Sequence, residues 1–409
     1  MPSLVGSEMC IRDRAIEDFD VVIVGGGIVG LSAACMLAPM VERIALVNKI
    51  PAPEWSPESD YGLRVSAINL ASQKLLTEIG VWDHIQQMRC ASYHDMVVWQ
   101  GLADAEMHFS ANMTRYNSLG AIVENNVLLQ ALSQQVKTLA NVSCYEPSSM
   151  QHFSELSDNS LLIELEDEQG QSHRLTSRLL IGADGVHSKV RSCAGISATR
   201  QDYQQSGVVC TVVTEKPHQD TAWQCFTEQG PLALLPLAGK HCSVVWSLPT
   251  AEAEQMLTLS DEDFNARLSM ASEYRLGGLQ IASKRASFPL AGSQANEYVS
   301  RRVVLLGDAA HAIHPLAGLG LNLGLEDLVC LQQLMQASDR ELGSERVLHC
   351  YQRARKTENS SMQQALEAID KLFRQPQPWF RSLRSIGFSA SNRCKPIKMA
   401  FMRRALGVR

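Results

Sequence analysis

The sequence has no excess of positive charge, no cysteines in a CxxC pair and no apolar leader. The net charge of -6 argues against nucleic acid as a main partner. The 11 cysteines are odd in number and scattered, which indicates free thiols in a reducing compartment rather than a disulfide framework or zinc site. The first residues mix both charge signs and are not a secretory signal. We therefore expect a cytoplasmic protein whose residues 1–17 form a disordered extension.

A transmembrane helix is one interpretation of residues 21–41, because they carry no charge and have about the length that spans a bilayer. Their internal order argues against it. A β-branched stretch is followed by three glycines and then by a helix-like stretch, which predicts strand, turn and helix. The whole chain, with 409 residues, 45% hydrophobic and 20% charged, has the composition of a soluble globular protein with two or more structural units.

A strand is expected at 43–49, after this helix, and completes a βαβ unit. Gly25, Gly27 and Gly30 fit the GxGxxG pattern. The first glycine permits the tight turn, the second lets a pyrophosphate approach the backbone, and the third lets helix and strand pack closely. The helix then presents free N–H groups and its positive dipole end to the phosphates. Asn48 stands where an acid usually holds a ribose hydroxyl, so a neutral amide is the expected acceptor.

A second apolar strand, within residues 178–191, leads into Asp184 and Gly185 and then into a helix. Ser188 is the expected cap of that helix. The same pattern also suits a plain strand-to-helix turn with Asp184 as a cap, so by itself it does not identify a binding site.

The third segment, residues 307–324, is poor in charge yet contains an acid, two histidines, a proline and four glycines. His311 and His314 have no third ligand nearby, which argues against a metal site. They are candidates for a proton carrier or for a packing and hydrogen-bonding role, and we favour the second. Helical spacing resumes from Leu321 to Met335, and further helices are expected within 345–373.

These three segments, in this order, resemble the class A FAD-dependent aromatic hydroxylases of the para-hydroxybenzoate hydroxylase superfamily. Residues 63–82, 119–132 and 242–249 are similar to the ubiquinone-biosynthesis hydroxylases, most of all to the 2-polyprenylphenol hydroxylases that oxidise ring carbon 5. The resemblance covers about residues 18–409 and implies an α/β fold. The implied fold consists of a Rossmann-like FAD-binding domain of the GR2 type, an inserted β-sheet substrate domain and C-terminal helices.

The expected division of the chain follows from this resemblance and from the β-rich texture of 203–248. An amphipathic helix with an acidic first turn is expected at 260–276. The units are the extension (1–17), a discontinuous FAD-binding domain (18–200, with part of the substrate region near 85–120, and 291–345 with the Gly-Asp motif and its helix), the β-rich substrate domain (201–290) and a C-terminal helical region with a basic tail (346–409).

The resemblance also assigns site residues. Asp308 accepts hydrogen bonds from ribityl hydroxyls, and Pro315 with the 318–320 turn brings a helix N-terminus to the flavin ring, where a positive dipole end stabilises the reduced flavin. Pro315, Leu319 and Gly320 are the candidates nearest the reacting atoms, although the catalysis itself is flavin-based. The cofactor-binding candidates are Gly25, Gly27, Gly30, Asn48, Arg64, Asn126, Asp184, Gly185, Gly307, Asp308, Pro315, Gly318, Gly320 and Asn322; no metal ligands are expected.

Two positions depart from the family pattern. Leu319 replaces the usual glutamine between the two glycines, which puts rate or substrate placement in doubt while the flanking backbone donors remain. Cys225 replaces a larger side chain. Nearby, Trp223, Phe226 and Trp246 are expected either to line a cavity or to form the sheet core.

The implied activity is that of an FAD-dependent monooxygenase. NAD(P)H reduces the flavin, O₂ adds to form a C4a-hydroperoxide, and its distal oxygen attacks the ring of a prenylated phenol. The sequence leaves open a flavin reductase that never uses O₂. It also leaves open a weakly catalytic scaffold of a ubiquinone-synthesis complex, which Asn48 and Leu319 favour. The choice between NADH and NADPH and the oligomeric state, a homo-oligomer included, also remain open.

The C-terminal segment 381–409 has eight basic residues and no acids, with apolar residues interleaved. This pattern is typical of a surface that meets an anionic membrane or an acidic partner such as a ubiquinone-synthesis complex. Peripheral attachment at the inner face of the membrane is therefore one expectation. The alternative is a C-terminal helix that packs on the domain and has a solvated basic face.

Overall fold

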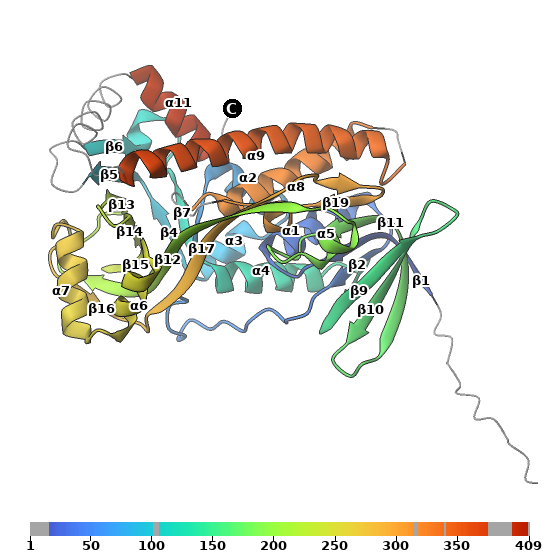
Figure 1. Cartoon of the computed structure of the whole chain (residues 1–409), viewed down its shortest axis with the longest axis horizontal. Helices are drawn as coiled ribbons and strands as arrows, with labels where there is room; N and C mark the ends of the chain where they lie inside the picture. The colour runs from blue at the N-terminus through green and yellow to red at the C-terminus, as the bar shows by residue number, and fades with distance from the viewer. Residues whose placement is uncertain (1–15, 101–105, 314–317, 339–340, 375–394, 408–409) are drawn as a thin grey trace, which may run out of the picture.

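The computed structural model describes residues 16–100, 106–313, 318–338, 341–374 and 395–407. Within these ranges the strands form three sheets, and helices cover and connect them (Figure 1). The expected α/β fold class is confirmed. Most of the expected extension, residues 1–15, lies outside the described residues.

The first sheet has parallel strands at its centre, in the order β18-β19-β11-β1-β2-β8. Its central segments are almost continuous apolar runs such as that of β1, as expected for strands buried on both faces. β10 pairs antiparallel with β11, and β9 pairs with β10. The strands are β1 (Glu17–Val24), β2 (Ile44–Val47), β8 (Val142–Tyr145), β9 (Ser148–Glu155), β10 (Leu161–Asp167), β11 (Ser172–Gly182), β18 (Val299–Ser300) and β19 (Val303–Leu305).

The predicted βαβ unit lies within this sheet. Residues 21–41 divide into β1, α1 (Ile28–Leu37) and the short helix η1 (Ala38–Met40), and β2 pairs parallel with β1. Among the described residues, no helix is both long enough and apolar enough to cross a membrane. α1 packs between α4 (Asn125–Lys137) and α8 (Gly320–Gln336).

The second sheet contains the β-rich region expected from the sequence, in the order β20-β17-β12-β15-β14-β13-β5-β6, with β16 beside β12. The long strand β12 crosses the division expected at residue 200. The strands are β5 (Asp95–Gln100), β6 (Glu106–Ser110), β12 (Ala198–Thr214), β13 (Thr221–Phe226), β14 (Pro231–Pro236), β15 (His241–Pro249), β16 (Leu279–Ile281), β17 (Ala286–Ala295) and β20 (His311–Ala312).

Two helices, α6 (Thr250–Thr258) and α7 (Asp261–Ala271), pack against the second sheet. Ser260 caps α7 by accepting from the N–H of Asp263, which confirms the predicted acidic start. The helix ends five residues before the predicted end, where the chain turns through positive φ at Glu273 and Tyr274.

The third sheet is small and lies beside the start of α8. It has the order β3-β7-β4 and packs with two short helices. These elements are β3 (Val65–Ile68), α2 (Leu70–Glu78), α3 (Trp82–Gln87), β4 (Cys90–Tyr93) and β7 (Gly120–Glu124).

The C-terminal elements are long helices, as predicted. α9 (Glu345–Arg374) runs beside α8 and crosses most of the molecule, and α11 (Lys395–Leu406) lies near β5 and β6 (Figure 1). The helices predicted at 321–335 and within 345–373 are thus confirmed.

Candidate cofactor and substrate site

The glycine-rich turn lies at the carboxyl end of β1, where α1 begins. A Cβ at Gly25 would collide with the backbone of Ala183, and one at Gly30 would collide with Gly25. A Cβ at Gly27 would meet no atom within 4 Å. Packing therefore leaves no room for a side chain at the first and third glycines, while the middle glycine faces open space. A turn that admits a pyrophosphate requires this arrangement. No side chain caps α1 at Gly27, so its first N–H groups remain for an anion.

Asn48 lies at the end of β2, directly beside this turn. Its Oδ1 accepts from the N–H of Gly26 at 3.2 Å. Its Nδ2 donates to the carbonyl of Ile50 at 2.6 Å and to Oε1 of Glu146 at 2.5 Å. The amide thus occupies the predicted place, but its oxygen already accepts a hydrogen bond from the backbone of Gly26.

The Asp184–Gly185 corner is adjacent, at the end of β11. The carboxylate of Asp184 accepts from Ser188 Oγ at 2.5 Å and from the N–H of Lys189 at 2.7 Å. Ser188 caps α5 (Lys189–Cys193) by accepting from the N–H of Arg191, which confirms the predicted cap. Gly185 has a φ of +81° with open space around it, so its backbone is accessible where a side chain would be strained.

Arg191 connects this second corner to the third. Its buried guanidinium donates to the carbonyl of Ala309 at 2.8 Å and to that of Val186 at 2.8 Å. Burial lowers the pKa of Arg191, an effect strengthened by Arg200 and opposed by Asp184. The two carbonyls fix the distance between the Asp184 and Asp308 turns.

The Gly307–Asp308 corner follows β19. Gly307 packs against Val29 and Gly324, which brings the starts of α1 and α8 together. Asp308 keeps contact with solvent, yet desolvation by the surrounding protein raises its pKa, an effect that the charges of His311 and Arg64 partly offset. These surroundings suit a carboxyl that is partly desolvated and can still accept hydrogen bonds from a ligand.

The start of α8 lies against β3. Gly318 has a φ of +60°, and a Cβ there would lie 3.4 Å from the Cβ of Ala67. Asn322 is buried; its Nδ2 donates to the carbonyl of Ala67 at 2.7 Å and its Oδ1 accepts from Ser72 Oγ at 2.8 Å. This amide therefore holds the helix start in place, and no side chain caps α8 at Leu319. The predicted Pro315 lies outside the described residues, as does His314.

Arg64 and Asn126 lie on neighbouring segments, as two residues predicted to bind the same cofactor should. The N–H of Asn125 donates to the carbonyl of Arg64 at 2.9 Å. The side chains of Arg64 and Asn126 are both exposed. The guanidinium carbon of Arg64 lies 5.5 Å from the centre of the Phe288 ring.

A buried ion-pair network behind the third corner escaped the sequence analysis. Asp327 of α8 accepts from the N–H of Gly307 at 3.1 Å, from His311 Nε2 at 2.5 Å and from Arg355 Nε at 2.7 Å. Asn359 donates to the same carboxylate at 3.1 Å. His311 thus has the hydrogen-bonding role that we favoured, and it faces a carboxylate.

The charges in this network support one another. Burial acts to raise the pKa of Asp327, but His311 and Arg355 outweigh it and hold the pKa below its usual value. Burial acts to lower the pKa of Arg355, and Asp327 outweighs that too. One sequence signal was present: Asp327 lies four residues from both Leu323 and Leu331, on the buried face of a helix, where an acid needs a partner.

An apolar cluster, called here the interface cluster, joins the start of α8 and the C-terminal half of α9 to the second sheet. Its members come from β5, β6 and β13 as well as from the two helices. Several, including Leu319, are only partly buried. The cluster contains Val98, Phe226, Ile313, Leu323 and Leu366, with Met96, Met107, Phe109, Leu319, Met362 and Ile369 against it. It places apolar side chains, some of them only partly buried, next to the segment assigned to the flavin.

The three aromatic residues noted in the sequence divide between two environments. Phe226 belongs to the interface cluster. Trp246 is 2% exposed in the core between the second sheet and its helices, and Trp223 packs there edge-on to Trp99. The buried Cys225 belongs to the same core.

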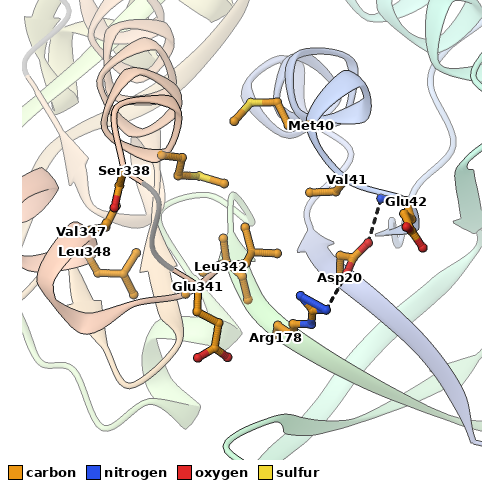
Figure 2. A pocket seen from close by; sticks show the side chains of 13 residues that line it. Asp20, Met40, Val41, Glu42, Arg178, Ser338, Glu341, Leu342, Val347 and Leu348 are labelled. Atoms are coloured by element: carbon orange, nitrogen blue, oxygen red, sulfur yellow. Dashed lines mark hydrogen bonds and ion pairs between the residues drawn. The ribbon is translucent and has the colours of Figure 1, made fainter.

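Two further observations concern other kinds of site. The described residues contain no group of three or more His, Cys, Asp or Glu side chains able to hold a metal ion. A cavity of about 360 Å³ lies at the amino ends of the parallel strands, where Asp20 accepts from the N–H of Glu42 and pairs with Arg178 (Figure 2). The glycine-rich and acidic turns lie at the carboxyl ends, so this cavity is separate from the candidate site.

Comparison with known proteins decides the family. A family model described as "FAD binding domain" matches residues 18–365. The chain belongs to this flavoprotein family. It is 35% identical to the 3-demethoxyubiquinol 3-hydroxylase of Escherichia coli, covering 95% of the chain and 98% of that protein. It is 34% identical to the mitochondrial ubiquinone biosynthesis monooxygenase COQ6 of Xenopus tropicalis, covering 94% and 92% respectively. With these relatives, the chain belongs to the ubiquinone-biosynthesis hydroxylases, a group of the class A flavin monooxygenases.

Solved structures agree on the fold of this flavin monooxygenase family. p-Nitrophenol 4-monooxygenase PnpA from Pseudomonas putida has a TM-score of 0.77 at 19% identity, over 96% of this chain and 100% of the other. PqsL from Pseudomonas aeruginosa has a TM-score of 0.74 at 19% identity, over 91% and 100%.

The residues of the candidate site fit FAD. The open backbone at Gly27 and the uncapped start of α1 suit the pyrophosphate. The solvent-facing Asp308 suits the ribityl hydroxyls, and the uncapped start of α8 suits the electron-rich edge of the flavin. The predicted role of each residue in binding remains a prediction.

Proposed function

We propose that this flavin monooxygenase hydroxylates the aromatic ring of a polyprenylated phenol in ubiquinone biosynthesis, with NAD(P)H as reductant. One oxygen atom of O₂ replaces a ring hydrogen as a hydroxyl group, and the other leaves as water. NAD(P)H and one proton supply the two electrons and two protons that this balance requires. Bound FAD supplies the oxygen-transfer chemistry, and the protein supplies position, charge stabilisation and exclusion of water.

The observation that carries the proposal is that the turn assigned to the flavin and the interface cluster share the start of α8. Gly318 and the start of α8 belong to the corner assigned to the flavin, and Leu319 and Leu323 of the same segment belong to the cluster. An apolar surface beside the flavin position suits a substrate with a hydrocarbon tail, because burial of each methylene contributes about 0.8 kcal/mol. Relatives named for ubiquinone biosynthesis support the same class.

Within that class, we propose ring carbon 5 of a 2-polyprenylphenol as the position hydroxylated. The Escherichia coli relative is named a 3-demethoxyubiquinol 3-hydroxylase, which makes 3-demethoxyubiquinol the second candidate substrate. Both substrates contain a phenolic ring, so the same apolar surface accepts either.

The test offers each substrate to the purified protein with NAD(P)H and ¹⁸O₂. Mass spectrometry measures the label, and nuclear magnetic resonance locates the new hydroxyl. We expect one ¹⁸O atom in each product and faster NAD(P)H oxidation when the substrate is added.

Two outcomes would favour the alternatives left open by the sequence. NAD(P)H oxidation that never places oxygen in the ring indicates a reductase. FAD binding without turnover of either substrate indicates a scaffold. A third outcome, in which only the product of 3-demethoxyubiquinol carries the label, keeps the proposed class and replaces the 2-polyprenylphenol by the second candidate substrate.

A further inference from the structure

At the expected ribose end of the candidate site, an amide stands where a carboxylate is usual, and a carboxylate lies beside it on the next strand. Asn48 follows β2 where a carboxylate usually accepts from a ribose hydroxyl, and its Oδ1 is already bound to the N–H of Gly26 at 3.2 Å. The neighbouring strand β8 pairs parallel with β2, with Val47 opposite Tyr145. The next residue, Glu146, therefore lies opposite Asn48.

Glu146 is joined to Asn48 and remains exposed. The Nδ2 of Asn48 donates to Oε1 of Glu146 at 2.5 Å. The hydrogen bond from Gly26 to Asn48 and the one from Asn48 to Glu146 form a chain that connects the glycine-rich turn to a carboxylate. Backbone bonds fix the strand ends as well, because the N–H of Asn48 donates to the carbonyl of Tyr145 at 3.0 Å and that of Ser148 donates to the carbonyl of Asn48 at 2.8 Å.

The orientation of the Asn48 amide depends on both partners. Its oxygen faces an N–H donor and its nitrogen faces a carboxylate acceptor, so a flipped amide would oppose like groups on both sides. The amide is consequently held with its donor toward Glu146. The hydrogen bond from Asn48 goes to Oε1 of Glu146, whose side chain is exposed, so Oε2 can accept two hydroxyl donors.

We propose that Glu146 supplies the carboxylate that accepts from the ribose hydroxyls in the adenosine half of FAD, one strand further out than the usual acid. Asn48 acts as the link that positions this carboxylate relative to the pyrophosphate turn. The inference rests on FAD binding by this site and is independent of which phenol is oxidised.

The test compares two ligands on the full-length protein after removal of its FAD. One ligand is FAD, and the other is an FAD analogue with 2′-deoxyribose in the adenosine half. Dissociation constants follow from quenching of flavin fluorescence. We expect the wild-type protein to prefer FAD over the analogue by about 10-fold, the size of one charge-assisted hydrogen bond.

The variant Glu146→Ala should bind FAD more weakly and lose most of this preference, because the group that senses the hydroxyl is gone. Glu146→Gln should keep the link to Asn48 and show an intermediate preference. Glu254→Gln, an equal change of charge at an exposed position of α6, is the matched control and should behave as wild type.

A preference for FAD that is unchanged in Glu146→Ala overturns the proposal and leaves Glu146 with a purely structural role toward Asn48. The same conclusion follows if the wild type binds both ligands equally. Neither result affects the proposed function, which the labelled-oxygen experiment tests with FAD bound. Failure of the wild type to bind FAD would instead remove the basis of both.

Discussion

At the scale of a single residue, the surroundings of Asp308 bear on both stability and ligand binding. Asp308 contacts solvent, and desolvation by its surroundings still raises its pKa. Because the folded protein holds this pKa above the unfolded value, the carboxyl contributes stability to the apoprotein at low pH, and this contribution is lost as pH rises through the folded pKa. The raised pKa means that the ionised form of Asp308 is disfavoured in the apoprotein, and we propose that this carboxyl serves a ligand.

The variant Asp308→Asn should therefore separate binding from stability. We expect the apoprotein to unfold at the same temperature as wild type or higher at pH 7, since the desolvated charge is removed. FAD affinity should fall by about 10-fold or more, because a charge-assisted acceptor contributes roughly 1.5–3 kcal/mol. Thermal unfolding of the apoprotein and FAD titration measure the two effects; a lower unfolding temperature with unchanged FAD affinity would contradict this account.

The helix α8 is the element that holds the site together. It packs through Gly324 on Gly307 and Val29, begins at the flavin corner, and carries Asp327 into contact with α9. The acid is buried completely, so its charge is stable only because Arg355 and His311 are in place. Removing one member of such a pair leaves an unpaired buried charge.

Arg355→Met should thus destabilise the protein by about 3–5 kcal/mol, the range found when a buried ion pair loses one partner. Arg353→Met provides the control on the same helix, because Arg353 is exposed and its loss should change the free energy of unfolding by less than about 0.5 kcal/mol. Denaturant unfolding gives both values. Equal stability of the two variants would show that Asp327 finds other partners or is protonated.

The difference between local and long-range signals explains what the sequence could predict. The turns that contain Gly25, Gly27 and Asp308 were predictable because each is a contiguous motif that directly follows an apolar strand. The Asp327–Arg355 pair was not, because it depends on how α9 lies along α8. Glu146 was missed for a similar reason: it reaches Asn48 only because β8 is the strand beside β2.

At the scale of the whole molecule, the part of the basic tail that the structure describes forms a helix, α11, with a packed side and an exposed basic side. Met402 and Leu406 of α11 are buried against the domain, and Lys398 lies over the Phe109 ring. This is the packed helix of the alternative interpretation. The opposite side of the same helix leaves Phe401 54% exposed beside the exposed Arg403 and Arg404. An apolar ring flanked by cations suits an anionic membrane surface, where a substrate with a hydrocarbon tail is found.

We expect the full-length protein to bind anionic phospholipid vesicles at low salt and to lose this binding as salt rises, because exposed charges are screened beyond ~8 Å at physiological ionic strength. The triple variant Phe401→Ser, Arg403→Gln, Arg404→Gln should bind less without a change in unfolding temperature, since these side chains are exposed. Met270→Ser, on the exposed face of α7, is the control for a lost apolar side chain. A wild-type protein that ignores anionic vesicles at low salt would rule out the membrane surface.

The guanidinium of Arg191 has a consequence for the order in which the protein matures on the ribosome. It reaches from the second corner to the carbonyl of Ala309, more than a hundred residues later in the chain, and the third corner in turn depends on Arg355. A nascent chain that has emerged only as far as the second corner has the pyrophosphate turn but neither the carbonyl that Arg191 binds nor the partner of Asp327. We therefore expect flavin capture to require the nearly finished polypeptide, because the corners are joined only once these late partners are present.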